Sequence, residues 1–293
     1  SEKKMIKEIQ AVTAKKLEAT LIDRHSNLGK LKKYKFGMIE RGIQLLSMNS
    51  FDFGLNKKGR QKYKSFLQEN FASIEERSET DCIILDLRQN DGGYMGNDSQ
   101  LFSYFAQDTF RDAASAEVKS LKIGVKDHLA RDQFPKMLER LLAKDFKPSA
   151  DGRLFMIDEK NRQWKPKKKA FDGHVFALIS GWTHSGGAVF CSYLLNNDNV
   201  TFIGEETGGG HATFTAGNMV LYDLPNSRCQ VEIPLILYEN YRGKKTFPKG
   251  SGIRPDHKVT QSQKDLINNV DTVMAFALQL ARKAATAKDA SEK

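Results

Sequence analysis

A serine followed by two glycines stands between two apolar runs, and this combination could support nucleophilic catalysis. The serine is Ser185, and Gly186 and Gly187 follow it in the stretch HVFALISGWTHSGGAVFCSYLLNN. A serine hydroxyl attacks a carbonyl group when a base accepts its proton. The N–H of Gly186 could stabilise the developing oxyanion, because a glycine backbone can approach a substrate closely. The structural alternative is that Ser185 only caps the next helix, a position that serine favours.

The apolar runs predict the elements that hold Ser185. Residues 175–179 are continuously apolar, which is typical of a buried parallel strand. Ser185 would then lie at a strand-to-helix turn, at the positive end of the helix dipole. Beyond Ser185, apolar residues recur at helical spacing, at Val189, Phe190, Tyr193 and Leu194.

A second glycine turn follows another apolar run. Residues 81–88 (DCIILDLR) predict a buried strand, which ends in a turn that contains Gly92 and Gly93. Ligands of layered α/β folds bind beyond the carboxyl ends of the strands. The two glycine turns could therefore meet at one site and supply two oxyanion donors. The alternative for Gly92 and Gly93 is a simple tight turn.

The remaining pattern alternates strands and helices, which predicts an α/β fold. We expect residues 107–170 to be an insertion with helices near 113–122 and 133–143, and long insertions of this kind often act as lids. Asn97 or Asp98 is expected to cap a helix over 99–106. Further strands are expected at 42–50, 200–204, 218–224 and 229–237, with a hairpin turn at 225–227 and helices at 58–77 and 263–285.

Composition excludes several classes of protein. The chain has 293 residues and a net charge of +10, but it contains no recognisable nucleic-acid-binding module. The basic cluster at 160–169 is expected to be a solvated loop or a surface that attracts acidic groups. No apolar run approaches the ~18 residues that span a bilayer. We expect no metal, because the sequence contains no Cys-x-x-Cys or His-x-x-x-His spacing. We also expect no cofactor. The three cysteines, Cys82, Cys191 and Cys229, are expected to be buried.

Four stretches in this order resemble the C-terminal processing (tail-specific) serine peptidases. They are DLRQNDGG at 86–93, GWTHSGG at 181–187, IGEETGGG at 203–210 and GIRPDHKV at 252–259. The family forms are close to D-L-R-x-N-x-G-G, G-T-x-S-x-x-E, V-G-E-x-T-x-G and G-x-x-P-D. Four motifs in the same order are far more specific than any one of them. The resemblance implies a crotonase-like ββα core with an inserted helical and loop cap.

The resemblance also implies roles for individual residues. Ser185 would be the nucleophile, and the oxyanion donors would be the N–H of Gly186 and that of Gly92 or Gly93. The peptidase domain would cover residues 34–288, with residues 1–33 as a linker or the tail of a preceding domain.

The chain departs from the family at the general base. Many members use a lysine on the loop after the serine, and this chain has Gly210 there. Related branches, including the tricorn-like peptidases, supply a histidine from a more N-terminal segment. We expect such a segment, with any PDZ domain, to lie before residue 1.

Local alternatives for the base exist. His211 stands one residue after the position of the family's lysine, and histidine is a side chain that commonly acts as a general base. Neighbouring side chains at such a turn tend to diverge, so His184 is a weaker choice. Glu205 and Glu206 could orient a histidine or bind substrate, or they could serve as caps or pair with nearby basic groups.

Three functions therefore remain open at the level of sequence. The first is a serine endopeptidase that acts on extended or C-terminal segments of a peptide or protein substrate. The second is a catalytically silent relative that binds peptides. The third is a crotonase-type acyl-thioester enzyme, although that chemistry needs no serine at this turn. The resemblance implies a periplasmic or cell-envelope location, and the oligomeric state stays open.

Overall fold

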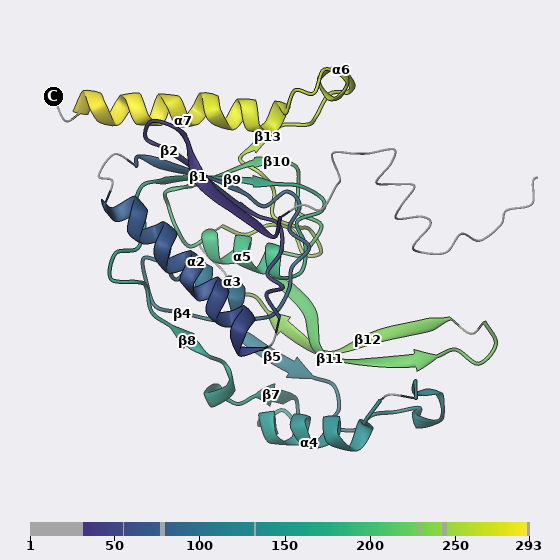
Figure 1. Cartoon of the computed structure of the whole chain (residues 1–293). Helices are drawn as coiled ribbons and strands as arrows, with labels where there is room; N and C mark the ends of the chain where they lie inside the picture. The colour runs from purple at the N-terminus through teal and green to yellow at the C-terminus, as the bar shows by residue number, and fades with distance from the viewer. Residues whose placement is uncertain are drawn as a thin grey trace, which may run out of the picture. The chain divides into compact units, whose positions relative to one another are not determined.

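The structure, a computed structural model, describes residues 32–54, 56–76, 80–131, 133–227, 229–241 and 245–291. Contacts within the chain separate Ser1–Lys32 from Lys33–Lys293. The elements below belong to the second unit (Figure 1). A strand that could form over 17–22 lies outside the described residues. The domain limits expected at 1–33 and 34–288 therefore stay a prediction.

A six-stranded sheet forms the centre of this unit, in the order β1-β2-β3-β9-β10-β13. β1 pairs antiparallel with β2, and the pairs from β2 to β13 are parallel. The two continuous apolar runs are confirmed as adjacent central strands, β3 and β9. β1 was not expected from the sequence. The strands are β1 (Tyr34–Glu40), β2 (Ile43–Met48), β3 (Cys82–Asp86), β9 (His174–Ile179), β10 (Val200–Gly204) and β13 (His257–Lys258).

Helices cover both faces of this sheet (Figure 1). Side chains alternate across a strand, so the residues of β3 divide between two cores. Ile83 and Leu85 face the core that includes α2, α3 and α5, whereas Cys82 and Ile84 face α7. This layering confirms the α/β class. The helices are α2 (Lys57–Glu76), α3 (Asn97–Phe102), α5 (Gly186–Leu194) and α7 (Thr272–Ser291).

The segment over 107–170 contributes to a second sheet, whereas a helical and loop cap was expected. The order of this sheet is β11-β12-β5-β7-β6, and β11 and β12 form a long hairpin (Figure 1). The helix expected at 113–122 is wrong, because residues 115–118 pair with both β12 and β7. The helix expected at 133–143 is confirmed as α4 (Pro135–Asp145).

The remaining elements of this part of the chain are short, apart from the hairpin strands. Between β5 and β7 the chain forms η2 before α4, and η3 follows β7. β4 and β8 pair as a separate two-stranded sheet. Their bounds are β4 (Phe110–Arg111), β5 (Ser115–Val118), η2 (Lys126–His128), β6 (Phe146–Pro148), β7 (Leu154–Met156), η3 (Asp158–Lys160), β8 (Gln163–Trp164), β11 (Thr213–Asp223) and β12 (Gln230–Glu239).

The single helix expected over 263–285 is two helices. α6 (Gln263–Ile267) ends before Asn269, which has a φ of 55°, and α7 begins at Thr272. Leu266 and Ile267 are exposed, so the buried apolar face begins only at Val273 in α7. None of the helices in the described ranges has the length and apolar character needed to cross a bilayer.

Two local expectations also need correction. Cys82 and Cys191 are buried, but Cys229 is exposed next to the hairpin turn. The residue that caps α3 is Gly96, with a φ of 90°, and neither Asn97 nor Asp98 takes that position. Glycine suits this place because it adopts a left-handed conformation without strain.

Candidate active site

Ser185 occupies a sharp turn between β9 and α5. Its φ of 51° and ψ of −129° lie outside the usual conformations of residues other than glycine. Strain of this kind is found at functional sites, where the surrounding structure holds it in place. Ser185 is exposed, and its side chain makes no capping hydrogen bond to α5. A purely capping role therefore lacks the hydrogen bond that defines it.

The second glycine turn lies directly against Ser185. β3 and β9 are parallel neighbours with Asp86 opposite Leu178, so the turns after them begin side by side. A Cβ atom added to Gly92 would lie 2.6 Å from the Ser185 Cβ and 2.8 Å from the Gly186 nitrogen. Carbon atoms in contact normally stay about 3.5–4.0 Å apart. Only glycine allows this approach, and the two turns meet as expected.

Two backbone amides beside Ser185 are left without acceptors. Among the described residues, the N–H groups of Gly186 and Gly93 make no hydrogen bond. The Gly93 nitrogen lies 3.5 Å from where a Cβ of Gly186 would be, so the two amides are neighbours. The Gly92 N–H instead donates to Asn90 Oδ1 at 2.9 Å. Of the two glycines expected as the second oxyanion donor, the geometry favours Gly93.

Asn90 organises this turn, although it was not singled out from the sequence. Its buried side chain donates to the Met48 carbonyl at 2.8 Å and accepts from the Gly92 N–H. Its own carbonyl accepts the His184 N–H at 3.1 Å. Asn90 thus joins β2, the glycine turn and the Ser185 loop. The asparagine in the family form D-L-R-x-N-x-G-G was the available signal.

Hydroxyl groups attach the Ser185 loop to the end of β3. Thr183 Oγ1 donates to the Leu87 carbonyl at 2.9 Å and accepts from the Ser180 N–H at 3.0 Å. Ser180 Oγ donates to the Arg88 carbonyl at 2.7 Å. These bonds hold the start and the middle of the loop, and the His184 N–H bond to the Asn90 carbonyl holds the end next to Ser185.

The glycine-rich loop after β10 runs beside the Ser185 loop. The Gly209 N–H donates to the Thr183 carbonyl at 3.2 Å, and a Cβ added to Gly209 would lie 3.3 Å from the Ser185 nitrogen. A Cβ added to Gly208 would lie 2.1 Å from the Gly181 carbonyl oxygen. The glycines therefore serve close packing of two loops.

His211 presents no free ring nitrogen to Ser185. Its side chain is buried, with Nδ1 at 3.1 Å from the Ser251 carbonyl and Nε2 accepting the Phe247 N–H at 3.2 Å. These contacts suit a neutral imidazole with its proton on Nδ1. The geometry argues against His211 as the general base. Within the described residues, no side chain is hydrogen-bonded to Ser185 Oγ.

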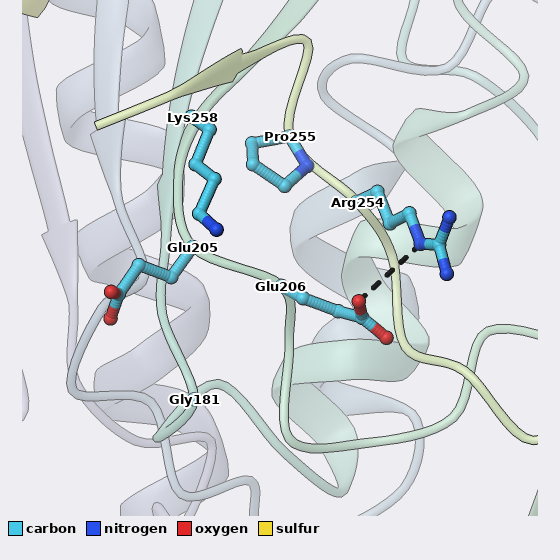
Figure 2. A pocket seen from close by; sticks show the side chains of 6 residues that line it. All are labelled: Gly181, Glu205, Glu206, Arg254, Pro255 and Lys258. Carbon is cyan, nitrogen blue, oxygen red and sulfur yellow. Dashed lines mark ion pairs between the residues drawn. The ribbon is translucent and has the colours of Figure 1, made fainter. Parts of the chain in front are cut away.

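A charged pocket of about 550 Å³ opens at the other end of the two loops (Figure 2). Glu206 lies at its side, with Oε2 at 3.4 Å from Arg254 Nε and Oε1 accepting the Gly252 N–H at 2.8 Å. Glu206 therefore pairs with a basic group, which is one of the roles expected for it from the sequence. Across the described ranges, no cluster of three His, Cys, Asp or Glu side chains could hold a metal ion. The pocket is lined by Gly181, Glu205, Glu206, Arg254, Pro255 and Lys258.

These features define a class of protein: a layered α/β fold with an exposed serine at a strand-to-helix turn, flanked by amides that are unpaired among the described residues. That arrangement suits acyl transfer. The chain belongs to peptidase family S41, because the model of that family matches residues 42–259. The matched range contains Ser185, both glycine turns and the loop that contains His211.

Solved structures with the same fold include bacterial peptidases. A candidate peptidase from Parabacteroides merdae is 19% identical, with a TM-score of 0.52, over 88% of this chain and 68% of the other. A candidate S41 protease from Bacteroides fragilis is 16% identical, with a TM-score of 0.53, over 85% and 58%. Mature CPAF complexed with lactacystin is 13% identical, with a TM-score of 0.56, over 83% and 52%.

These identities establish the fold alone. The chain spans only about half to two thirds of the length of these structures. A comparison with curated proteins found no match.

Proposed function

We propose that this chain is a serine peptidase in which Ser185 is the nucleophile. The N–H groups of Gly186 and Gly93 would hold the oxyanion. The observation that carries the proposal is the strained, exposed Ser185 beside two amides that have no acceptor within the described ranges. Membership of family S41 supports the same serine-type peptidase class.

The chemistry would follow the acyl-enzyme route. Ser185 Oγ bonds to the scissile carbonyl carbon while its proton passes to a base, and the carbonyl oxygen becomes an oxyanion held by two amides. Collapse breaks the C–N bond, and the amine leaves with a proton. Water then hydrolyses the ester and restores the hydroxyl group. We assign no general base, because no side chain among the described residues is hydrogen-bonded to Ser185 Oγ.

Membership of family S41 supports proposals for the substrate class and the location. Extended or C-terminal peptide segments are the proposed substrates, a crotonase-like core is the proposed fold subtype, and the cell envelope or periplasm is the proposed location. Relatives of bacterial origin among the solved structures are compatible with that location.

One observation favours a second candidate, a peptide-binding relative without catalysis. Among the residues that the structure describes, no base is hydrogen-bonded to the Ser185 hydroxyl, and His211 is engaged with backbone groups. A serine without a base is a weak nucleophile. The two candidates differ in whether Ser185 is activated, which a covalent probe measures directly.

The test is labelling of the folded chain with a fluorophosphonate, with the modified residue located by mass spectrometry. We expect labelling of the original chain and none of Ser185→Ala. The matched control is Ser149→Ala, which removes an exposed serine of a turn outside the site and should leave labelling unchanged. Absence of labelling in the folded original chain would reject a self-sufficient peptidase and favour the peptide-binding candidate.

A further variant tests the assignment of His211. If its ring only joins backbone groups, the folded His211→Ala chain should still be labelled at Ser185. Folding is checked by circular dichroism before the probe is added. Complete loss of labelling in a folded His211→Ala chain would restore His211 as the base.

A further inference from the structure

Two carboxylates and two basic side chains line the charged pocket, and one of the basic side chains, Lys258, is unpaired among the described residues. Figure 2 shows the Lys258 side chain pointing into the pocket, whereas the carboxylate of Glu205 points away from it. Glu205 accepts a hydrogen bond from the Thr260 hydroxyl at 3.2 Å. In the described part of the chain, Lys258 makes no ion pair. The ammonium group of Lys258 is therefore available to an anionic ligand.

Arg254 adds a second, partly available cation. Its Nε lies 3.4 Å from Glu206 Oε2, and across the described ranges no second carboxylate pairs with the guanidinium. An arginine offers five N–H donors in a planar fork, and a carboxylate matches two of them. Lys258 and Arg254 come from one short segment, separated by four positions, and both line the pocket. Together they favour a carboxylate over a neutral or basic group.

The pocket lies within peptide reach of Ser185. Gly181 lines it, and four residues of chain lead from Gly181 to Ser185, a span of at most about 14 Å. The glycine-rich loop runs alongside this segment, since Gly208 packs on Gly181 and Gly209 packs on Ser185. A peptide whose reacting carbonyl sits at Ser185 thus needs no more than about four extended residues to enter the pocket.

We propose that Lys258 and Arg254 bind a carboxylate of the peptide substrate, within about four residues of the bond at Ser185. This inference rests on the proposed peptide substrate. Two sources share the chemistry: an aspartate or glutamate side chain, and the C-terminal carboxylate of the peptide. Part of the pair is exposed to solvent, so salt should weaken the interaction.

The experiment measures binding without cleavage, by fluorescence polarisation on the full Ser185→Ala chain. Three fluorescein-labelled nonapeptides of alanine and leucine serve as probes. The first carries one central glutamate and an amidated C-terminus, the second has glutamine in place of glutamate, and the third has glutamine and a free C-terminal carboxylate. We expect the first or the third to bind about 5-fold or more tightly than the second.

Two variants in the Ser185→Ala background show whether the pocket causes the preference. Lys258→Met should abolish it, and Lys64→Met, which removes the same charge from the exposed face of α2, should leave it intact. Both side chains are exposed, and thermal unfolding checks that both chains fold. The peptide that binds better identifies the source of the carboxylate.

Two outcomes overturn the inference: equal binding of all three peptides, or a preference that survives Lys258→Met. Labelling of Ser185 is measured separately, on the original chain, and does not depend on this pocket. Failure of the carboxylate site is therefore distinguishable from failure of the peptidase proposal. Conversely, a preference lost in Lys258→Met together with no labelling would support a carboxylate-binding site in a catalytically silent chain.

Discussion

Ser185 reaches the surface through a backbone conformation that costs free energy. A non-glycine residue at a φ of 51° and ψ of −129° carries strain of about 1–3 kcal/mol. The neighbouring loops sustain it, through the hydroxyl groups of Ser180 and Thr183 and through the close approach of Gly92. The hydroxyl is thereby held out of the helix-capping position and beside two amides that have no acceptor in the described part of the chain.

At the residue scale, Ser185→Gly should make the protein more stable than Ser185→Ala. Glycine adopts this conformation without Cβ strain, and alanine does not, so we expect a difference of about 1 kcal/mol in the free energy of unfolding. Both variants lack the hydroxyl group, so the effect of losing it is the same in both and cancels in the comparison. Urea titration of the two chains gives the difference. Equal stability would show that the backbone at Ser185 is unstrained.

At the scale of elements, the end of β3 is tied to the C-terminal helix as well as to the active turn. Arg88 donates to both oxygens of Asp86 and to both oxygens of Asp271, which precedes α7, at 2.7–2.9 Å. Burial acts to raise the pKa of Asp271, but hydrogen bonds from Arg88 and from backbone groups outweigh it and lower the pKa. The family motif D-L-R therefore positions a helix as well as a strand.

Arg88→Met should destabilise the protein because it leaves two carboxylates without their shared partner. Methionine keeps much of the aliphatic packing, so the loss is mainly electrostatic. We expect the free energy of unfolding to fall by about 2–3 kcal/mol, less than for a fully buried pair because Asp271 is partly exposed. The control Arg153→Met breaks an exposed pair with Asp151 and should change stability little. An equal effect of both variants would contradict this role of Arg88.

At the scale of the whole molecule, a buried acidic cluster makes stability depend on pH. Asp98 is almost fully buried in α3, and burial raises its pKa to about 7. Asp112 nearby also has a raised pKa because of burial, opposed by hydrogen bonds from Ser99 and Trp164. The folded state therefore holds protons that the unfolded chain releases at lower pH.

The sign of this effect follows from linkage. The pKa of Asp98 is higher in the folded state, so its contribution is fully favourable below its unfolded pKa of 3.8 and is lost as pH rises to about 7. Between pH 5 and pH 8, Asp98 should cost the original chain about 2–3 kcal/mol of stability. Asp98→Asn keeps an oxygen for the Gly96 and Ser99 N–H groups and should remove most of this loss.

Guanidinium titrations at the two pH values measure the effect for both chains. The quantity compared between the two chains is the change in the free energy of unfolding from pH 5 to pH 8. A cost of the new amide group that is the same at both pH values cancels in this comparison. If Asp98→Asn loses as much stability from pH 5 to pH 8 as the original chain, Asp98 does not titrate in the folded state.

The sequence by itself determined the α/β class, the central strands β3 and β9, and Ser185 between a strand and a helix. These features are local, because apolar runs, helical spacing and glycine pairs are properties of neighbouring residues. The approach of the two glycine turns was also predictable, since parallel strands end at one edge of a sheet.

Only the tertiary structure decided the features that depend on distant partners. Residues 115–118 form a strand because β12 and β7 pair with them, which overrides their helical pattern. Gly93 is favoured over Gly92 because the Asn90 side chain occupies the Gly92 N–H. His211 is engaged by backbone groups at Phe247 and Ser251, about 40 residues further along. Hydrogen-bond partners across such separations are set by packing, which residue spacing does not encode.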